Sequence, residues 1–391
     1  MSAEIGDRLR DVRKRRGMSQ RELSQQSGVS LSLIRKLEQG ERSDTRLETV
    51  HMLASALRVS TTRLITSHIE EAADPTVIRS WEPLHRALAG RTTTDDLAEA
   101  PTVDGVTQAV DGAMRLFSSN QFAKLGTVLP PLLRDTETLA ALDHRGRAPH
   151  MRVLQLVAWL LVQTRQFASA ELVLERSLDG AVDQLQGAAT INTQCWSLLR
   201  QGRLSESREL ALRWADDTEP RLSRATAGDL STWGWMLLRV SASAVRDNRP
   251  GEAADALRLA KSAATALGQQ HETVDHLRSF GPLTVKLKHA ENAMIVQKPD
   301  HVLSLAEQIP INVAGLTPSD VNRHRLDVAN AYAHTRQYTK SVETLLDIQH
   351  AAPEWLSNQR YARDILGSII KRRRTLTPEM RSLAAAVHLP I

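Results

Sequence analysis

Cationic side chains are concentrated in the first sixth of this 391-residue sequence, where they could bind a polyanion. Residues 1–65 contain 13 Lys and Arg against 8 Asp and Glu, a net charge of +5, and the remaining residues contain 37 of each. A localised positive charge attracts phosphate groups, and this attraction falls steeply as salt is added. Residues 1–65 are therefore the first candidate for a binding surface.

The sequence contains no motif that is typical of catalysis. GxGxxG, GxxxxGK[ST] and GxSxG are absent, and the one cysteine, Cys195, excludes an internal disulfide and a zinc site built on two thiolates. His271, Glu272 and His276 form one suggestive cluster. On a helix, however, two histidines at this spacing point about 140° apart, whereas a metal needs them on one face. We predict no enzyme activity, no cofactor and no metal site.

Composition and length predict a soluble protein of two or three domains. Hydrophobic residues make up 41% of the sequence and charged residues 24%, as in ordinary globular proteins. No run approaches the ~18 consecutive apolar residues of a membrane helix, and the first residues lack the apolar core of a secretory signal. We expect a cytoplasmic protein without a membrane partner.

Five short helices are predicted between residues 4 and 64. The first spans 4–16, the second runs to about 27, the third spans 31–39, the fourth runs from about 46 to 57, and a final turn lies near 61. Ser19 and Glu22 have the spacing of a capping box, and Ser30 is the expected N-cap of the third helix. Short helices around a turn that contains Gly28 are typical of a helix-turn-helix.

The segment MSQRELSQQSGVSLSLIRKLEQGER resembles the Xre/Cro-type family of bacterial and phage regulators. The positions that match the family pattern are Ser19, Gln20, Leu23, Gly28, Val29, Ile34, Leu37, Glu38 and Gly40. The resemblance covers about 60 residues. It implies that double-stranded DNA is a partner and that helix 31–39 lies in the major groove.

The resemblance also implies the roles of individual side chains. The base-reading positions are Leu31, Ser32, Arg35 and Lys36. Lys36 can donate to O6 and N7 of guanine, and Leu31 can contact a thymine methyl group. The phosphate-binding positions are Gln20, Ser30, Arg42 and Ser43.

Two further features follow from the same resemblance. Arg13 and Glu38 fall where relatives form an ion pair between the first and third helices; the alternative is a solvated pair worth under ~1 kcal/mol. One domain reads a short half-site, so we predict a homodimer on two half-sites ~34 Å apart. The alternative for the whole domain is a module used for dimerisation or protein contact.

Beyond a connector at 66–103, with one helix around 78–88, the sequence repeats. Paired amphipathic helices meet at Gln121-Phe122, Gln166-Phe167, Arg203-Leu204, Arg249-Pro250, Lys298-Pro299 and Gln337-Tyr338. These turns lie 45, 37, 46, 49 and 39 residues apart, which is typical of a helical solenoid. We predict an all-α chain with domains at 1–65, 66–103 and 104–391, the last a right-handed α-solenoid ending in a capping helix.

Small residues recur at fixed positions around these turns. Nine positions before the second residue of each turn come Ala113, Ala158, Cys195, Ser241, Ala290 and Ala329. Three positions after it come Leu125, Ala170, Ser207, Ala253, Val302 and Ser341, a looser column. These columns are similar to those of tetratricopeptide repeats. Cys195 is therefore interpreted as a packing residue.

The register of that family places a set of polar and aromatic side chains on the concave side of the solenoid. The predicted groove residues are Arg152, Gln155, Trp159, Asn192, Trp196, Arg200, Trp235, Arg246, Arg323 and Asn330. Amides can pair with a peptide backbone, guanidinium groups can bind a carboxylate, and Trp offers flat apolar area. The alternative is that the three tryptophans are ordinary core residues between helices.

An Xre-type domain followed by such repeats resembles the RRNPP group of quorum-sensing peptide-pheromone receptors. The resemblance implies a transcriptional regulator in which a signal, a peptide or a small organic molecule, binds the repeats and modulates DNA binding. Two alternatives are a repeat scaffold that docks a protein partner without a small ligand, and a Rap-like activity on a response regulator. The complete DNA-binding domain argues against the second.

Overall fold

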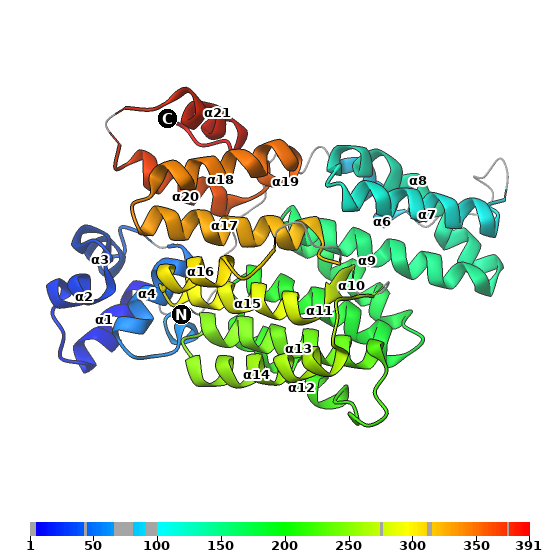
Figure 1. The fold of residues 1–391 in the computed structure, drawn as a ribbon, viewed down its shortest axis with the longest axis horizontal. Helices are drawn as coiled ribbons and strands as arrows, with labels where there is room; N and C mark the ends of the chain where they lie inside the picture. Colours follow the sequence, from blue (N-terminus) through cyan, green and yellow to red (C-terminus); the bar gives the residue numbers. More distant parts are fainter. Residues whose placement is uncertain are drawn as a thin grey trace.

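The computed structural model describes residues 5–42, 45–65, 81–90, 100–273, 277–310, 315–373 and 375–391. In these ranges the chain is helical apart from one short antiparallel pair, β1 (His271–Thr273) and β2 (Arg278–Phe280) (Figure 1). This hairpin places His271 and Glu272 on a strand, where we had considered a helix, and His276 lies outside the described residues.

The first helices form a small domain with its own core, which we call the head. Its elements are α1 (Ile5–Arg15), α2 (Gln20–Ser27), α3 (Leu31–Glu38), α4 (Leu47–Ala56) and the 3₁₀ helix η1 (Thr61–Arg63). Ser19 Oγ accepts from the backbone N–H of Glu22 (3.2 Å) and Glu22 Oε2 accepts from that of Ser19 (2.7 Å), so the predicted capping box is present. Gly28 ends α2 at φ 71°, a conformation that favours glycine. The predicted helix positions are therefore confirmed.

The rest of the described chain stacks antiparallel helix pairs into a solenoid. The pairs are α7 (Val103–Ser118) with α8 (Phe122–Leu142), α9 (Arg147–Gln163) with α10 (Phe167–Asp179), α11 (Gln184–Arg200) with α12 (Leu204–Asp217), α13 (Ala227–Arg246) with α14 (Pro250–Leu267), α15 (Pro282–Ile295) with α16 (Pro299–Ala306), and α17 (Pro318–His334) with α18 (Tyr338–Ala351). The short 3₁₀ helix η3 (His144–Gly146) joins the first two pairs. The predicted all-α fold, a helix-turn-helix domain followed by helical repeats, is confirmed.

Helices outside the pairs cover the two ends. The connector helix α6 (Glu82–Ala89) buries Leu84 in the apolar core that it shares with the first pairs. After the last pair come α19 (Pro353–Ser357), α20 (Arg360–Ile370) and α21 (Pro378–Ala386). Residues 66–80 and 91–99 are outside the described ranges, so the boundaries 1–65, 66–103 and 104–391 stay predictions.

Each predicted turn joins the two helices of one pair through the same backbone geometry. The residue before each turn has a positive φ, between 56° and 77°: Asn120, Arg165, Gly202, Asn248, Gln297 and Arg336. The next N–H then donates to a carbonyl five residues earlier, as from Gln121 to Leu116 (3.0 Å) and from Gln337 to Tyr332 (2.8 Å). This Schellman geometry satisfies the carbonyls at the end of one helix and starts the next.

The two columns of small residues lie against each other inside the pairs. All of their members are buried, and hydroxyl groups cross the gap: Ser207 Oγ donates to the carbonyl of Cys195 (2.9 Å) and Ser341 Oγ to that of Ala329 (2.7 Å). Burial raises the pKa of the Cys195 thiol to about 12, so the thiol is neutral and unreactive. Its position agrees with the packing interpretation.

The two ends of the solenoid meet. Glu354 Oε2 on α19 accepts from the backbone N–H of Ala123 at the start of α8 (2.8 Å), and Ser319 Oγ donates to Asn120 Oδ1 (3.3 Å). Phe122 and Trp355 belong to one apolar core, and α19 lies beside α8 in Figure 1. The first helices of the pairs therefore surround a central space.

Candidate functional sites

Helix α3 presents the polar face that a recognition helix needs. Ser32, Arg35 and Lys36 are exposed, Leu31 is half-buried, and Ile34 is fully buried in the core of the head. Apolar positions thus fix one face of α3 while the side chains predicted to read bases remain accessible.

A buried ion pair positions α3 against α1. The Nε and Nη2 atoms of Arg13 each donate to a carboxylate oxygen of Glu38 at 2.7 Å, and the side chain of Glu38 is 3% exposed. Burial disfavours a charged carboxylate, but hydrogen bonds from Arg13 and Gln20 hold the pKa of Glu38 below its ordinary value. The interpretation as a buried pair is confirmed, and the solvated alternative is wrong.

The residues predicted to bind phosphate lie around the ends of α2 and α3. Gln20 donates to Glu38 Oε2 (2.8 Å), Ser30 caps α3 by accepting from the N–H of Leu33 (3.3 Å), and Arg42 is exposed after α3. Ser43 lies outside the described residues. Gln20 thus helps to hold the ion pair that positions α3.

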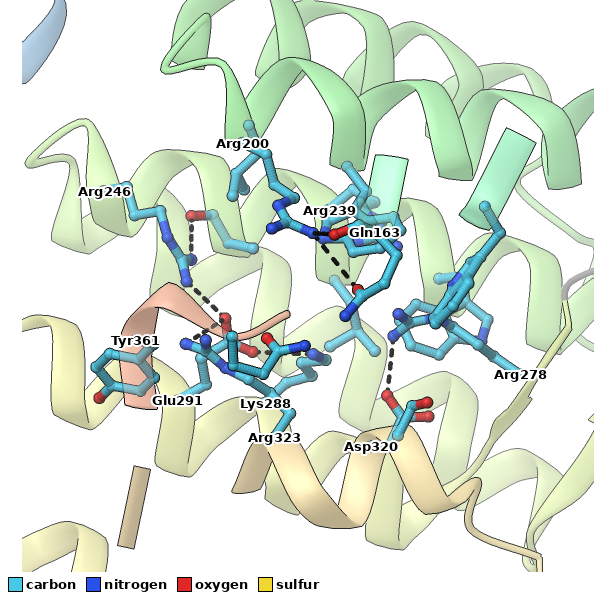
Figure 2. A pocket seen from close by; sticks show the side chains of 18 of the residues that line it. Gln163, Arg200, Arg239, Arg246, Arg278, Lys288, Glu291, Asp320, Arg323 and Tyr361 are labelled. Atoms are coloured by element: carbon cyan, nitrogen blue, oxygen red, sulfur yellow. Dashed lines mark hydrogen bonds and ion pairs between the residues drawn. The ribbon is translucent and has the colours of Figure 1, made fainter. Parts of the chain in front are cut away.

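A central cavity of about 240 Å³ lies between the first helices of the solenoid (Figure 2). The predicted groove residues that line it are Trp159, Trp196, Arg200, Trp235, Arg246 and Arg323. The tryptophans are therefore both core residues and cavity walls: Trp235 is fully buried, and the rings of Trp159 and Trp196 lie 5.5 Å apart.

The other predicted groove residues lie elsewhere. Gln155 is buried, and Arg152 pairs with Asp111 (3.2 Å) in a separate hollow beside α7. Asn192 is buried and accepts from Arg239 Nε (2.6 Å), so it positions a cavity residue. Asn330 donates to the hydroxyl of Tyr361 (2.9 Å) at a second cavity.

Sequence reasoning missed several cavity residues, chiefly Arg239, Arg278, Lys288, Asp320 and Tyr361. Arg239 follows Trp235 by four positions and precedes Arg246 by seven, so helical periodicity could have found it. Arg278 comes from β2, which belongs to no repeat unit, and no periodic signal could have found it.

The cavity wall is strongly cationic. Among the described residues that line it, eight are Lys or Arg and two are Asp or Glu. Glu291 contacts Arg246 Nη2 (2.5 Å) and Lys288 Nζ (2.9 Å), and Asp320 contacts Arg278 Nη1 (2.8 Å). Burial disfavours the charge on Glu291, but Lys288, Arg246 and Arg323 hold its pKa well below the ordinary value.

The head docks on the solenoid through the end of α13. The backbone carbonyl of Arg246 accepts from Thr61 Oγ1 (2.7 Å) and lies 2.9 Å from His51 Nδ1, and Asp247 Oδ1 accepts from the hydroxyl of Thr62 (2.8 Å). Burial lowers the pKa of His51, which favours the neutral imidazole. This interface uses α4 and η1, so it leaves the exposed side chains of α3 accessible.

A second cavity, of about 260 Å³, lies at this interface. The head contributes Leu47, Glu48 and His51, and the solenoid contributes residues that include Asn330. It shares five wall residues with the central cavity: Leu199, Arg200, Arg246, Arg323 and Tyr361. The two cavities are therefore separated only by a layer of side chains.

Within the described residues, no helix combines the length and apolarity needed to cross a membrane. The same residues contain no group of three or more His, Cys, Asp or Glu that could hold a metal ion.

Comparison with known proteins agrees with the geometry of the head. Residues 9–64 match a family model described as helix-turn-helix. No curated protein matches the chain at a significant level of similarity. The protein thus carries a helix-turn-helix domain of the Xre type, the DNA-binding part of a transcription regulator.

Proposed function

We propose that this protein is a sequence-specific transcriptional regulator whose repeats bind a signal that modulates DNA binding. The head supplies base reading through Ser32, Arg35 and Lys36 in the major groove. A homodimer would place two heads on two half-sites, and the signal would be a peptide or a small organic molecule, as in quorum sensing in the cytoplasm.

The observation that carries this proposal is the double role of Arg246. Its guanidinium group lies in the wall of the central cavity against Glu291, and its backbone carbonyl holds Thr61 and His51 of the head. A ligand that competes for this guanidinium group would disturb the end of α13, to which the head is bound.

Such coupling requires a ligand that binds the repeats more tightly in one state of the head, docked or released, than in the other. The interface contains several hydrogen bonds, among them Asn248 Nδ2 to the carbonyl of Val59 (3.0 Å), and the packing of Leu47 against Leu199 and Ala242. A ligand can shift the equilibrium between docked and released head only by the difference in its affinity for the two states. An interface with a modest number of contacts is therefore suited to a switch.

The test is a gel-shift titration of the full chain on duplex DNA that flanks its own gene, with and without culture extract. We expect preferential binding over random duplex at physiological ionic strength, and a shift of affinity when extract is present. Absence of preference in both conditions would contradict the proposal. Native mass spectrometry then identifies the cargo: recovery of a protein partner without any peptide-sized or smaller molecule would favour the scaffold alternative.

A further inference from the structure

Among the described residues that line the central cavity, Arg239 is a buried cation without a carboxylate partner. Among the described residues, Arg246, Arg278, Lys288 and Arg323 form ion pairs at the cavity, whereas Arg239 forms none. Its Nε donates to the neutral Oδ1 of Asn192, and the residue is 5% exposed. Burial lowers the pKa of Arg239 to about 9, yet the group stays charged at neutral pH. A buried charge of this kind is stabilised when an anion joins it.

Three buried donors line the same cavity without an acceptor. In the described part of the chain, Nε1 of Trp159, Nε1 of Trp235 and Nε2 of Gln163 have no hydrogen-bond partner, and the three side chains are at most 3% exposed. An indole N–H is only a donor, and a buried donor without a partner costs stability. Figure 2 shows Gln163 beside Arg239 and Arg200, across the cavity from Glu291, Lys288 and Arg323. A ligand that supplies oxygen acceptors would therefore satisfy the donors of this wall.

The walls also offer flat apolar surfaces. The guanidinium group of Arg278 lies 5.6 Å from the ring centre of Trp196 and 5.4 Å from that of Trp235, and Arg239 lies 5.5 Å from Trp235. Alternating indole and guanidinium planes favour a planar ligand, which can stack on both.

The cavity is too small for an extended peptide. Its volume of about 240 Å³ is below the ~300–1,000 Å³ that is usual for drug-sized ligands. The contact between Glu354 and Ala123 joins α19 to the first helix pair, which bounds the space on that side.

We propose that the central cavity binds a compact anion: a carboxylate or phosphate group carried on a flat, unsaturated body. The anionic oxygens accept from Arg239, Trp235 and Gln163, and the flat body stacks on the indole rings. This assignment specifies the ligand class of the proposed function. The role of the anion as a signal rests on that proposed function, whereas binding of the anion to the cavity does not depend on DNA.

The test is isothermal titration calorimetry of the full chain, in the absence of DNA, with charged probes and neutral counterparts. Indole-3-carboxylate is compared with indole-3-carboxamide, and phenyl phosphate with phenol; acetate and inorganic phosphate serve as anions without a ring. We expect at least one charged probe to bind about tenfold or more tightly than its neutral counterpart. The arm with the larger ratio distinguishes a carboxylate from a phosphate ligand. Equal affinities within both pairs, or no binding of either charged probe up to about 10 mM, would overturn the assignment.

Two variants locate the binding. Arg239→Gln removes the unpaired charge and should weaken the charged probe about tenfold, whereas Arg258→Gln, at an exposed position of α14, should leave it unchanged. Trp235→Phe keeps a ring but removes the N–H and should weaken binding about threefold, with Trp214→Phe as its control. Circular dichroism checks folding, and if Arg239→Gln fails to fold, Trp235→Phe decides. Equal binding by Trp235→Phe and its control would place the anion elsewhere.

The two proposals fail separately. A charged probe that binds in calorimetry without affecting the gel shift keeps the ligand class and removes the signalling role. An extract that shifts DNA affinity while the cavity accepts only neutral probes keeps the signalling role and removes the ligand class.

Discussion

The head and the central cavity both concentrate cations, but they hold them in opposite ways. On α3, Arg35 and Lys36 are exposed, and in the described part of the head the buried Arg13 has Glu38 as its carboxylate partner. In the cavity, Arg239 is buried against the ring of Trp235 and has no carboxylate partner among the described residues. An exposed cation is already solvated, so it suits a polyanion that is met at the surface and is screened by salt. A buried cation without a carboxylate partner suits an anionic ligand that is desolvated when it binds.

The largest effect is expected from breaking the matched pair. Glu38→Ala leaves Arg13 buried without its carboxylate and should destabilise the head by about 3–5 kcal/mol. Chemical denaturation followed by circular dichroism measures the loss. Glu41→Ala, an exposed acidic position nearby, should change stability by less than ~0.5 kcal/mol. Similar curves for the two variants would show that the pair contributes nothing to the head.

Removing exposed cations of the head should change DNA binding without changing stability. Lys36→Ala should cost about 1–3 kcal/mol on the preferred site and relax base choice. Arg42→Ala should weaken binding to all sequences and lower the salt dependence, because Arg42 is at a position predicted to bind a phosphate. Gel shifts on specific and random duplexes separate the two effects. Equal losses on every sequence from both variants would show that our register of α3 is wrong.

Amide positions of the repeats should affect the response to the signal and leave the head alone. Asn192→Ala removes the acceptor of Arg239 Nε, and Asn330→Ala removes the donor to Tyr361. We expect unchanged DNA affinity without extract and a response to extract weakened about tenfold, a loss of ~1.4 kcal/mol. Gel shifts over a dilution series of extract measure this. Full response in both variants would argue against this part of the groove assignment.

The smallest effect concerns pH at the interface between head and solenoid. His51 faces Arg246 and Asp247, and burial lowers its pKa. When the head is released, the imidazole returns to an ordinary pKa of about 6.5. Docking therefore has its full strength above about pH 6.5 and weakens as the pH falls towards the lowered pKa of the docked state.

Hydrogen exchange of the amides around η1 between pH 7.5 and 5.5, corrected for the intrinsic rate, tests this. Protection should fall with pH in the wild type and change less in His51→Gln, which does not titrate. An identical pH profile in the two proteins would exclude His51 as the cause.

The local features of the chain were predictable because short-range geometry sets them. The capping box at Ser19 and Glu22, the buried face of α3 at Ile34 and the position of each helical turn depend on residues within about one turn of each other. The helices of the head and the positions of the turns therefore follow from the sequence alone.

From the resemblance to tetratricopeptide repeats we also predicted that Trp196 and Trp235 lie on the concave side, and both side chains line the central cavity. Only the tertiary structure decided that the solenoid closes, that Glu354 meets Ala123, that β2 brings Arg278 to the cavity, and that the carbonyl of Arg246 holds the head. Each of these depends on the summed rotation between successive helix pairs. That rotation is small for each pair and leaves no pattern in the sequence, but over the whole solenoid it fixes which distant residues meet.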